Sequence, residues 1–233
     1  MYHLATVFPF LRRYPLPVTR DQLFLVKMAM NLFYLSVDIY LAHSISGTIV
    51  PNEWIPIVFG LVGAVLLVIA GLIALANRPL ATVIATLTLL VSIAVGLLGA
   101  YFHLIRGILP TGPAGERITL DLLVWAPPIL GPLMFSFVGL LGLSAAWIEE
   151  PPDSGILVLW GDHRIQLPYS KTRAYFYIVG MGALATVLSS ALDHARLNFA
   201  NPWLWVPTLI GAFAAVVAVI LGAIEAVSYT HLT

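Results

Sequence analysis

The stretch LAHSISGTIVPNEWIP, residues 41–56, ends one long apolar run and begins the next. It contains a histidine, a glycine four residues later, and then a proline, a tryptophan and a second proline in close succession. A glycine just past a helix end and a proline in the first turn of a helix are typical of helix boundaries. The stretch is therefore predicted to be a turn between two antiparallel helices. A similar stretch, LDHARLNFANPWLWVP, occupies residues 192–207, and this recurrence predicts an internal repeat.

The composition of the chain is that of a membrane protein. Of its 233 residues 60% are hydrophobic and only 9% are charged, whereas a soluble domain carries about 25% charged residues. Apolar runs of roughly 20 residues are long enough to cross a bilayer as helices, and they lack the alternation of barrel strands. We therefore expect an all-α polytopic membrane protein with one transmembrane domain, residues 22–227. The six predicted spans are residues 22–43, 55–76, 79–103, 122–147, 174–195 and 204–227.

The positive charges predict an orientation. Eight of the 11 Lys and Arg residues lie in the N-terminal segment or in connections on the same side of the membrane. Positive residues favour the cytoplasmic side, so the N-terminus is predicted to be inside, in the plasma (inner) membrane of a bacterium. The stretch 41–56 then faces outward. No cleavable signal peptide is evident.

The repeat extends into the second helix of each hairpin. With His43 aligned to His194 no gap is needed, and the matched pairs are Pro51 and Pro202, Trp54 and Trp205, Pro56 and Pro207, and Gly60 and Gly211. The pattern Trp-x-Pro-x3-Gly recurs at Trp125, after a loop that follows His103 and is 11 residues longer. The chain is therefore predicted to be three tandem hairpins related by an axis along the membrane normal. These repeats are residues 22–76, 79–147 and 174–227.

Most repeated residues have a structural explanation. The glycine or asparagine four residues after each histidine suits the left-handed residue past a helix end. These are Gly47, Gly107 and Asn198. The tryptophans suit the headgroup level of the membrane, and the glycines that follow them allow close helix packing. Pro56, Pro127 and Pro207 are expected in the first turn of the second helix.

The three histidines, His43, His103 and His194, each end the first helix of a predicted hairpin. If they face the repeat axis, three imidazoles converge at one depth and form a site for a transition metal such as zinc, copper or iron. A histidine at a helix C-terminus also interacts favourably with the helix dipole, so each residue can instead be structural. A proton- or ion-handling site is the third alternative.

Carboxylates gather at the same level but do not follow the repeat. Glu53, Asp121 and Asp193 are candidate catalytic residues, as fourth ligand, orienting group or general base beside the metal. Asp193 can instead pair with Arg196, and the other two can favour the helix N-termini that they precede. Asp38 precedes the first histidine by five residues, about 140° around the helix and deeper in the membrane, so it need not share the histidine's face.

The remaining segments are short. Residues 1–21 are basic, aromatic and interrupted by prolines, which is typical of an interfacial segment. The loop 148–173 alternates apolar and polar residues around Gly161-Asp162, which predicts a small β-hairpin. Residues 228–233, SYTHLT, do not continue the sixth span and are expected to be a non-native tail.

Two classes of function follow from these observations. The first is an outer-face metalloprotein: a hydrolase acting on a substrate at the level of the lipid, a copper or iron oxidoreductase, or a metal-delivery factor. The alternative is a transporter of ions or small solutes, or a membrane scaffold subunit without a site. Membrane lipid is the expected partner, with a membrane or cytosolic protein contacting the loop 148–173. The zero net charge favours no nucleic acid, and the absence of cysteine excludes thiol chemistry.

Overall fold

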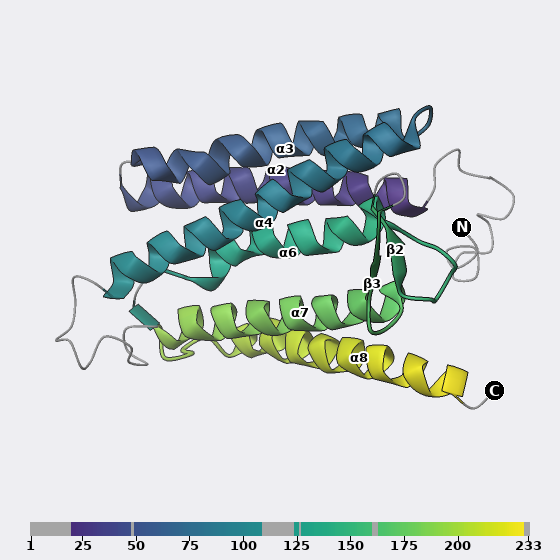
Figure 1. Cartoon of the computed structure of the whole chain (residues 1–233). Coiled ribbons are helices and arrows are strands. Elements are labelled where there is room, and N and C mark those ends of the chain that lie inside the picture. Colours follow the sequence, from purple (N-terminus) through teal and green to yellow (C-terminus); the bar gives the residue numbers. More distant parts are fainter. Residues whose placement is uncertain (1–19, 48, 109–123, 126, 160–162, 231–233) are drawn as a thin grey trace, which may run out of the picture.

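The structure is a computed structural model that describes residues 20–47, 49–108, 124–125, 127–159 and 163–230. Asp121, the centre of the predicted β-turn, residues 1–19 of the predicted N-terminal segment and residues 231–233 of the predicted C-terminal tail lie outside these residues. The described part contains six long α-helices and a small sheet (Figure 1). The helices are α2 (Arg20–Ser46), α3 (Trp54–Ile73), α4 (Arg78–Ile108), α6 (Leu130–Ala146), α7 (Lys171–Ala195) and α8 (Trp205–Thr230).

Five of the helices are long and apolar enough to cross a membrane, judged by their length and composition. The sixth, α6, has 17 residues and is equally apolar but shorter. The prediction of a mostly helical membrane protein is thus confirmed. The boundaries of most spans agree with the predicted ones to within a few residues.

The helix α6 is shorter than its predicted span, residues 122–147. It begins at Leu130, directly after the sequence Pro127-Pro128-Ile129. Proline has no backbone N–H to donate and keeps the residue before it out of the helical region, so two adjacent prolines delay the start of the helix. The prediction that Pro127 lies in the first turn of this helix is therefore wrong. Pro132 is the proline in that turn instead.

The helices run roughly side by side, and the ends of the predicted hairpins lie together (Figure 1). We call this the turn end; it holds the short 3-10 helices η2 (Pro51–Glu53) and η3 (Pro202–Leu204). The opposite end, which carries the β-strands, is the sheet end. The helix α2 packs against α3 and α6, and α4 packs against α3 and α6, so these four helices form one bundle.

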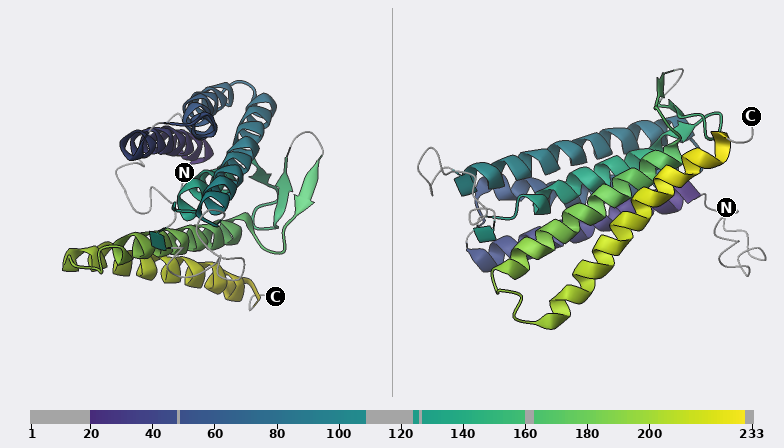
Figure 2. Two further views of the ribbon diagram at one scale, coloured as in Figure 1. Left: turned by 90° about the vertical axis from the view of Figure 1, so that its left-hand side faces the viewer. Right: turned by 90° about the horizontal axis from the view of Figure 1, so that it is seen from below.

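The third hairpin lies beside this bundle. The principal contacts of α8 are with α7 and η3, and α7 joins the bundle through α6. Figure 2 shows α7 and α8 as a separate pair next to the other four helices. Gly180 is the one buried residue of α7, so this helix is less deeply packed than the helices of the bundle. The described helices therefore do not form the closed ring that three equivalent hairpins around one axis would give.

Two of the predicted turns have the same local structure. Each consists of a 3-10 turn that begins at a proline, Pro51 or Pro202, followed by an α-helix that begins at a tryptophan, Trp54 or Trp205. Asn198 has the predicted left-handed conformation, with φ at 50°.

The first helix of the second hairpin ends differently from the prediction. The helix α4 continues to Ile108, past its expected end at His103. His103 therefore lies more than a turn before the helix end, and Gly107 lies inside the helix and not beyond it.

The interface between α4 and α6 forms the centre of the bundle. The Ser92 hydroxyl donates to the carbonyl of Phe135 at 2.7 Å, and the Ser136 hydroxyl donates to the carbonyl of Ile93 at 2.9 Å. A Cβ atom added at Gly139 would lie 2.6 Å from the carbonyl oxygen of Leu89. Small residues and hydroxyl-to-carbonyl bonds let the two backbones approach closely, as is common between membrane helices.

The loop between α6 and α7 forms a three-stranded antiparallel sheet of β1 (Ile148–Glu149), β2 (Ile156–Val158) and β3 (Arg164–Gln166). The predicted β-hairpin is thus confirmed as strands β2 and β3, and β1 adds a third strand. A Glu149 carboxylate oxygen accepts hydrogen bonds from the backbone N–H groups of Gly155 and Lys171, at 2.7 and 2.9 Å. Because Lys171 begins α7, this carboxylate holds the sheet against the helix N-terminus.

Candidate functional site

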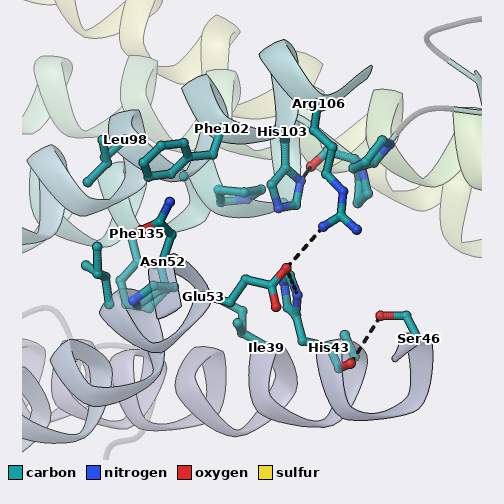
Figure 3. Close-up of a pocket in the computed structure, with 18 of the residues that line it drawn as sticks. Ile39, His43, Ser46, Asn52, Glu53, Leu98, Phe102, His103, Arg106 and Phe135 are labelled. Carbon is teal, nitrogen blue, oxygen red and sulfur yellow. Dashed lines mark hydrogen bonds and ion pairs between the residues drawn. The ribbon is translucent and has the colours of Figure 1, made fainter. Parts of the chain in front are cut away.

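A cavity of about 820 Å³ lies at the turn end, between the first hairpin and the helices α4 and α6 (Figure 3). On α2 it is lined by residues spaced at intervals of three and four, which places them on one helix face. These residues are Leu35, Asp38, Ile39, Ala42, His43 and Ser46.

The helix α4 lines the cavity with the same spacing. Each α2 position has its counterpart 60 residues later, the same offset that aligns His43 with His103. The matching residues are Val95, Leu98, Gly99, Phe102, His103 and Arg106. The two first helices of the first two predicted hairpins thus present equivalent faces to one cavity.

The polar end of the cavity is organised around the Glu53 carboxylate (Figure 3). One oxygen lies 3.0 Å from Nδ1 of His43 and 3.1 Å from a guanidinium nitrogen of Arg106. The other oxygen accepts the backbone N–H of Val50 at 3.0 Å. The side chain of Glu53 is only 12% exposed, and it connects the turn of the first hairpin, the end of α2 and the end of α4.

The local sequence explains why Glu53 lies there. Pro51 begins η2, so the turn forms without needing a backbone donor at that position. Glu53 is the third residue of η2, where a carboxylate can bond back to the N–H of the residue before the turn. The carboxylate is thereby held against Val50 and directed at the neighbouring helices.

His103 is oriented by a different acceptor. Its Nδ1 lies 2.9 Å from the carbonyl oxygen of Pro128, in the segment that precedes α6. Because a carbonyl only accepts, this nitrogen carries the hydrogen. By the same reasoning Nδ1 of His43 donates to Glu53. In its neutral form each ring then has an Nε2 lone pair, and no described residue makes a hydrogen bond to either Nε2.

The structure brings together some of the predicted site residues and not others. His43, His103 and Glu53 lie at one end of the cavity, and the two imidazole centroids are 6.1 Å apart. His194 does not line the cavity, and its ring contacts Phe199 instead. Asp193 pairs with Arg196 at 3.5 Å, which is the surface pairing considered as the alternative.

A three-histidine metal centre gains no support from this placement. In the part of the chain that the structure describes, no group of three or more His, Cys, Asp or Glu side chains could hold a metal ion. This statement does not extend to Asp121, which lies outside the described residues. Metal binding at this end of the molecule stays a prediction.

The cavity also contains polar residues that the sequence did not single out. Arg106 reaches Glu53, and Asn52 and Arg196 line the cavity. Arg106 could have been predicted as a site residue, because it lies three residues after His103 and hence on the same helix face. The role of the Pro128 carbonyl could not have been predicted, because every residue has a carbonyl group and none is marked in the sequence as an acceptor. Arg196 is the third hairpin's contribution in place of His194.

The helices and the cavity define the class of the protein: an integral membrane protein with an apolar cavity that is polar at one end. No protein-family model matches the chain, and no curated protein or solved structure matches it. The geometry of this cavity is therefore what indicates its chemistry.

Proposed function

We propose that this membrane protein binds an amphiphilic molecule in the cavity at its turn end. The apolar part of the molecule lies between α2 and α4, and its polar group points toward the turn end, where His43, Glu53 and Arg106 lie. The observation that carries this proposal is one cavity with apolar walls and a hydrogen-bonded polar end.

The size and lining of the cavity support this function. Binding sites for small molecules have volumes of roughly 300–1,000 Å³, mostly apolar walls and a few well-placed polar groups. The volume of about 820 Å³ falls within this range. Leu35, Ile39, Leu98, Phe102 and Phe135 supply the apolar walls.

The polar end also suits proton transfer. Glu53 holds His43 by Nδ1, and a carboxylate in this position fixes the tautomer and stabilises the imidazolium that forms when Nε2 takes a proton. His43 is then the general base, and Glu53 is a positioning residue. A hydroxyl group of the bound molecule, or a water beside it, is the proton donor that this arrangement fits. The predicted hydrolase acting at the lipid level is consistent with this chemistry.

Photo-crosslinking tests the binding function. The protein is placed in lipid nanodiscs with a diazirine-bearing dodecanol, irradiated and digested for peptide mapping. We expect labelling on the lining segments of α2 and α4 that excess unlabelled dodecanol competes away. Ala42→Phe fills the cavity and should abolish this labelling, whereas Val58→Phe, on an exposed position of α3, should not. Equal labelling in the wild type and in Ala42→Phe would overturn the proposal.

Metal binding is the second candidate, and one observation favours it. Metal-ligating histidines usually donate their other ring N–H to a carboxylate or a backbone carbonyl. His43 does so to Glu53, and His103 does so to Pro128. Zinc, copper or iron would then bind the two Nε2 atoms, with Asp121 as the predicted carboxylate. Elemental analysis of the wild type and of His103→Ala tests this: a stoichiometric metal lost in the variant supports it, and no metal in either excludes it.

We further propose that the turn end faces outward, with the N-terminus inside a bacterial inner membrane. The exposed side chains of Trp54, Trp125, Trp203 and Trp205 at the turn end support a headgroup level there. The loop 148–173 then faces the cytosol, where a protein partner can contact it.

Because the chain has no cysteine, Ser46→Cys and Asp153→Cys give single labelling sites. An impermeant maleimide should label the first variant in intact cells and the second only after lysis; the reverse pattern would invert the topology.

We also propose that the hairpins arose from one repeated unit. The equivalent cavity faces of α2 and α4 and the matching turns at Pro51 and Pro202 support this origin. The third hairpin has the same turn as the first, but its two helices pack beside the four-helix bundle and not within it.

A further inference from the structure

Deeper in the cavity than the two histidines, one pair of matching wall positions differs in charge. On α2 the position carries Asp38, whereas the matching position of α4 carries Leu98. Asp38 lies five residues before His43, which is roughly 7.5 Å deeper along the helix. It belongs to the segment Asp21–Ser46, which is long and apolar enough to cross a membrane, and a carboxylate there is costly and marks a functional candidate.

The two carboxylates that line the cavity differ in their surroundings. Glu53 accepts from three donors, including Arg106. Asp38 has no hydrogen-bond or ion-pair partner among the residues that the structure describes. Its neighbours on the cavity face, Leu35, Ile39 and Ala42, are apolar. The Asp38 side chain is exposed on a cavity-lining face of a helix long and apolar enough to cross a membrane, where a positively charged group of a ligand would compensate its charge.

We propose that the amphiphile is a cationic one, a long-chain amine whose ammonium group pairs with Asp38. This inference rests on the proposed binding function. The alkyl chain extends past Leu35 and Val95, which lie one turn further from the turn end. The rings of Phe102 and Phe135 in the cavity wall offer aromatic faces to the cation.

Competition in the crosslinking assay tests the charge preference. Dodecylamine, dodecanol and dodecanoate compete with the diazirine-bearing dodecanol in nanodiscs of zwitterionic lipid. For the wild type we expect dodecylamine to compete on the order of tenfold better than dodecanol, and dodecanoate to compete worst. Asp38→Leu should remove the advantage of the amine, measured as the ratio of competition by dodecylamine to competition by dodecanol within the variant.

The matching position on α4 provides the control. The double variant Asp38→Leu with Leu98→Asp moves the carboxylate to the opposite wall of the same cavity and should restore the preference for the amine. Asp193→Asn, a carboxylate change outside the cavity, should keep the wild-type preference. Equal competition by amine and alcohol in the wild type, or an unchanged preference in Asp38→Leu, would overturn the inference while leaving the binding function in place. Loss of all specific labelling by the dodecanol probe in the wild type would instead overturn the binding function itself.

Discussion

Replacement of Glu53 by alanine is the most direct test of how the turn end is held together. The carboxylate accepts hydrogen bonds from the backbone N–H of Val50 and from His43, both at 3.0 Å, and pairs with Arg106 at 3.1 Å. Without it, the turn, the end of α2 and the end of α4 lose their shared acceptor. We expect a lower free energy of unfolding and a polar end that no longer orients His43.

The size of this loss follows from the exposure of each partner. A hydrogen bond to a charged group contributes about 1.5 kcal/mol when it is shielded from water, and an exposed ion pair contributes about 0.5 kcal/mol. The bond from His43 belongs to the first kind, because its side chain is 18% exposed and that of Glu53 12%. The bond from Val50 is exposed and the Arg106 side chain is 68% exposed, so each of these contributes about 0.5 kcal/mol. Water entering the cavity replaces part of what is lost, so the expected decrease is about 2 kcal/mol. Glu53→Gln should lose about half as much, because its amide oxygen still accepts the Val50 N–H.

The assay is unfolding by SDS in mixed micelles, followed by circular dichroism. Asp193→Asn is the matched control, because it removes a carboxylate at the same end of the molecule. Asp193 is 59% exposed and pairs with Arg196 at 3.5 Å, so the control should change stability by no more than about 0.5 kcal/mol. A decrease in Glu53→Ala no larger than that of the control would refute the assigned role of this carboxylate.

Three further predictions concern the bundle and the sheet. Gly139→Leu should destabilise the protein by roughly 3 kcal/mol in the same titration, because its Cβ would lie 2.6 Å from a carbonyl oxygen of α4. Gly71→Ala, with nothing within 4 Å of the added Cβ, should be neutral or slightly stabilising, and an equal loss in both would contradict the close packing. Ser92→Ala removes a buried 2.7 Å hydrogen bond to α6 and should cost about 0.6 kcal/mol; a change of several kcal/mol would point to a larger role. Glu149→Ala should speed hydrogen exchange of the Lys171 amide about tenfold by mass spectrometry, and unchanged protection would show that the sheet does not need this acceptor.

Much of the local structure was predictable because its causes are local. Apolar runs of membrane-crossing length located the helices, and the residues around Pro51 and Pro202 predicted two turns that have the same conformation in the structure. The alternation around residue 161 predicted strands β2 and β3. The errors were also local in origin: consecutive prolines shortened α6, and α4 continued past His103 because Gly107 alone does not end a helix and the next proline is Pro110.

The candidate site was predictable only in part. Equivalent positions in a sequence repeat were expected to converge, and His43 and His103 do lie at one end of the same cavity. His194 does not, because the third hairpin packs beside the bundle through α6 instead of closing a ring. Asp38 was set aside because it lies far around the helix from His43. The cavity is wide enough for both edges of this α2 face to border it.

The sequence by itself determined the membrane class, the positions of the helices and the residue types available at each turn, because hydrophobic length and turn chemistry act over a few residues. Only the tertiary structure decided which helices are neighbours, and therefore that Glu53 joins His43 to Arg106 and that Asp38 faces a cavity. The physical reason is that helices in lipid all have apolar outer surfaces. Their pairing depends on close contacts between small residues and on hydrogen bonds to backbone carbonyls, such as those between α4 and α6, which a pattern of apolar residues does not record.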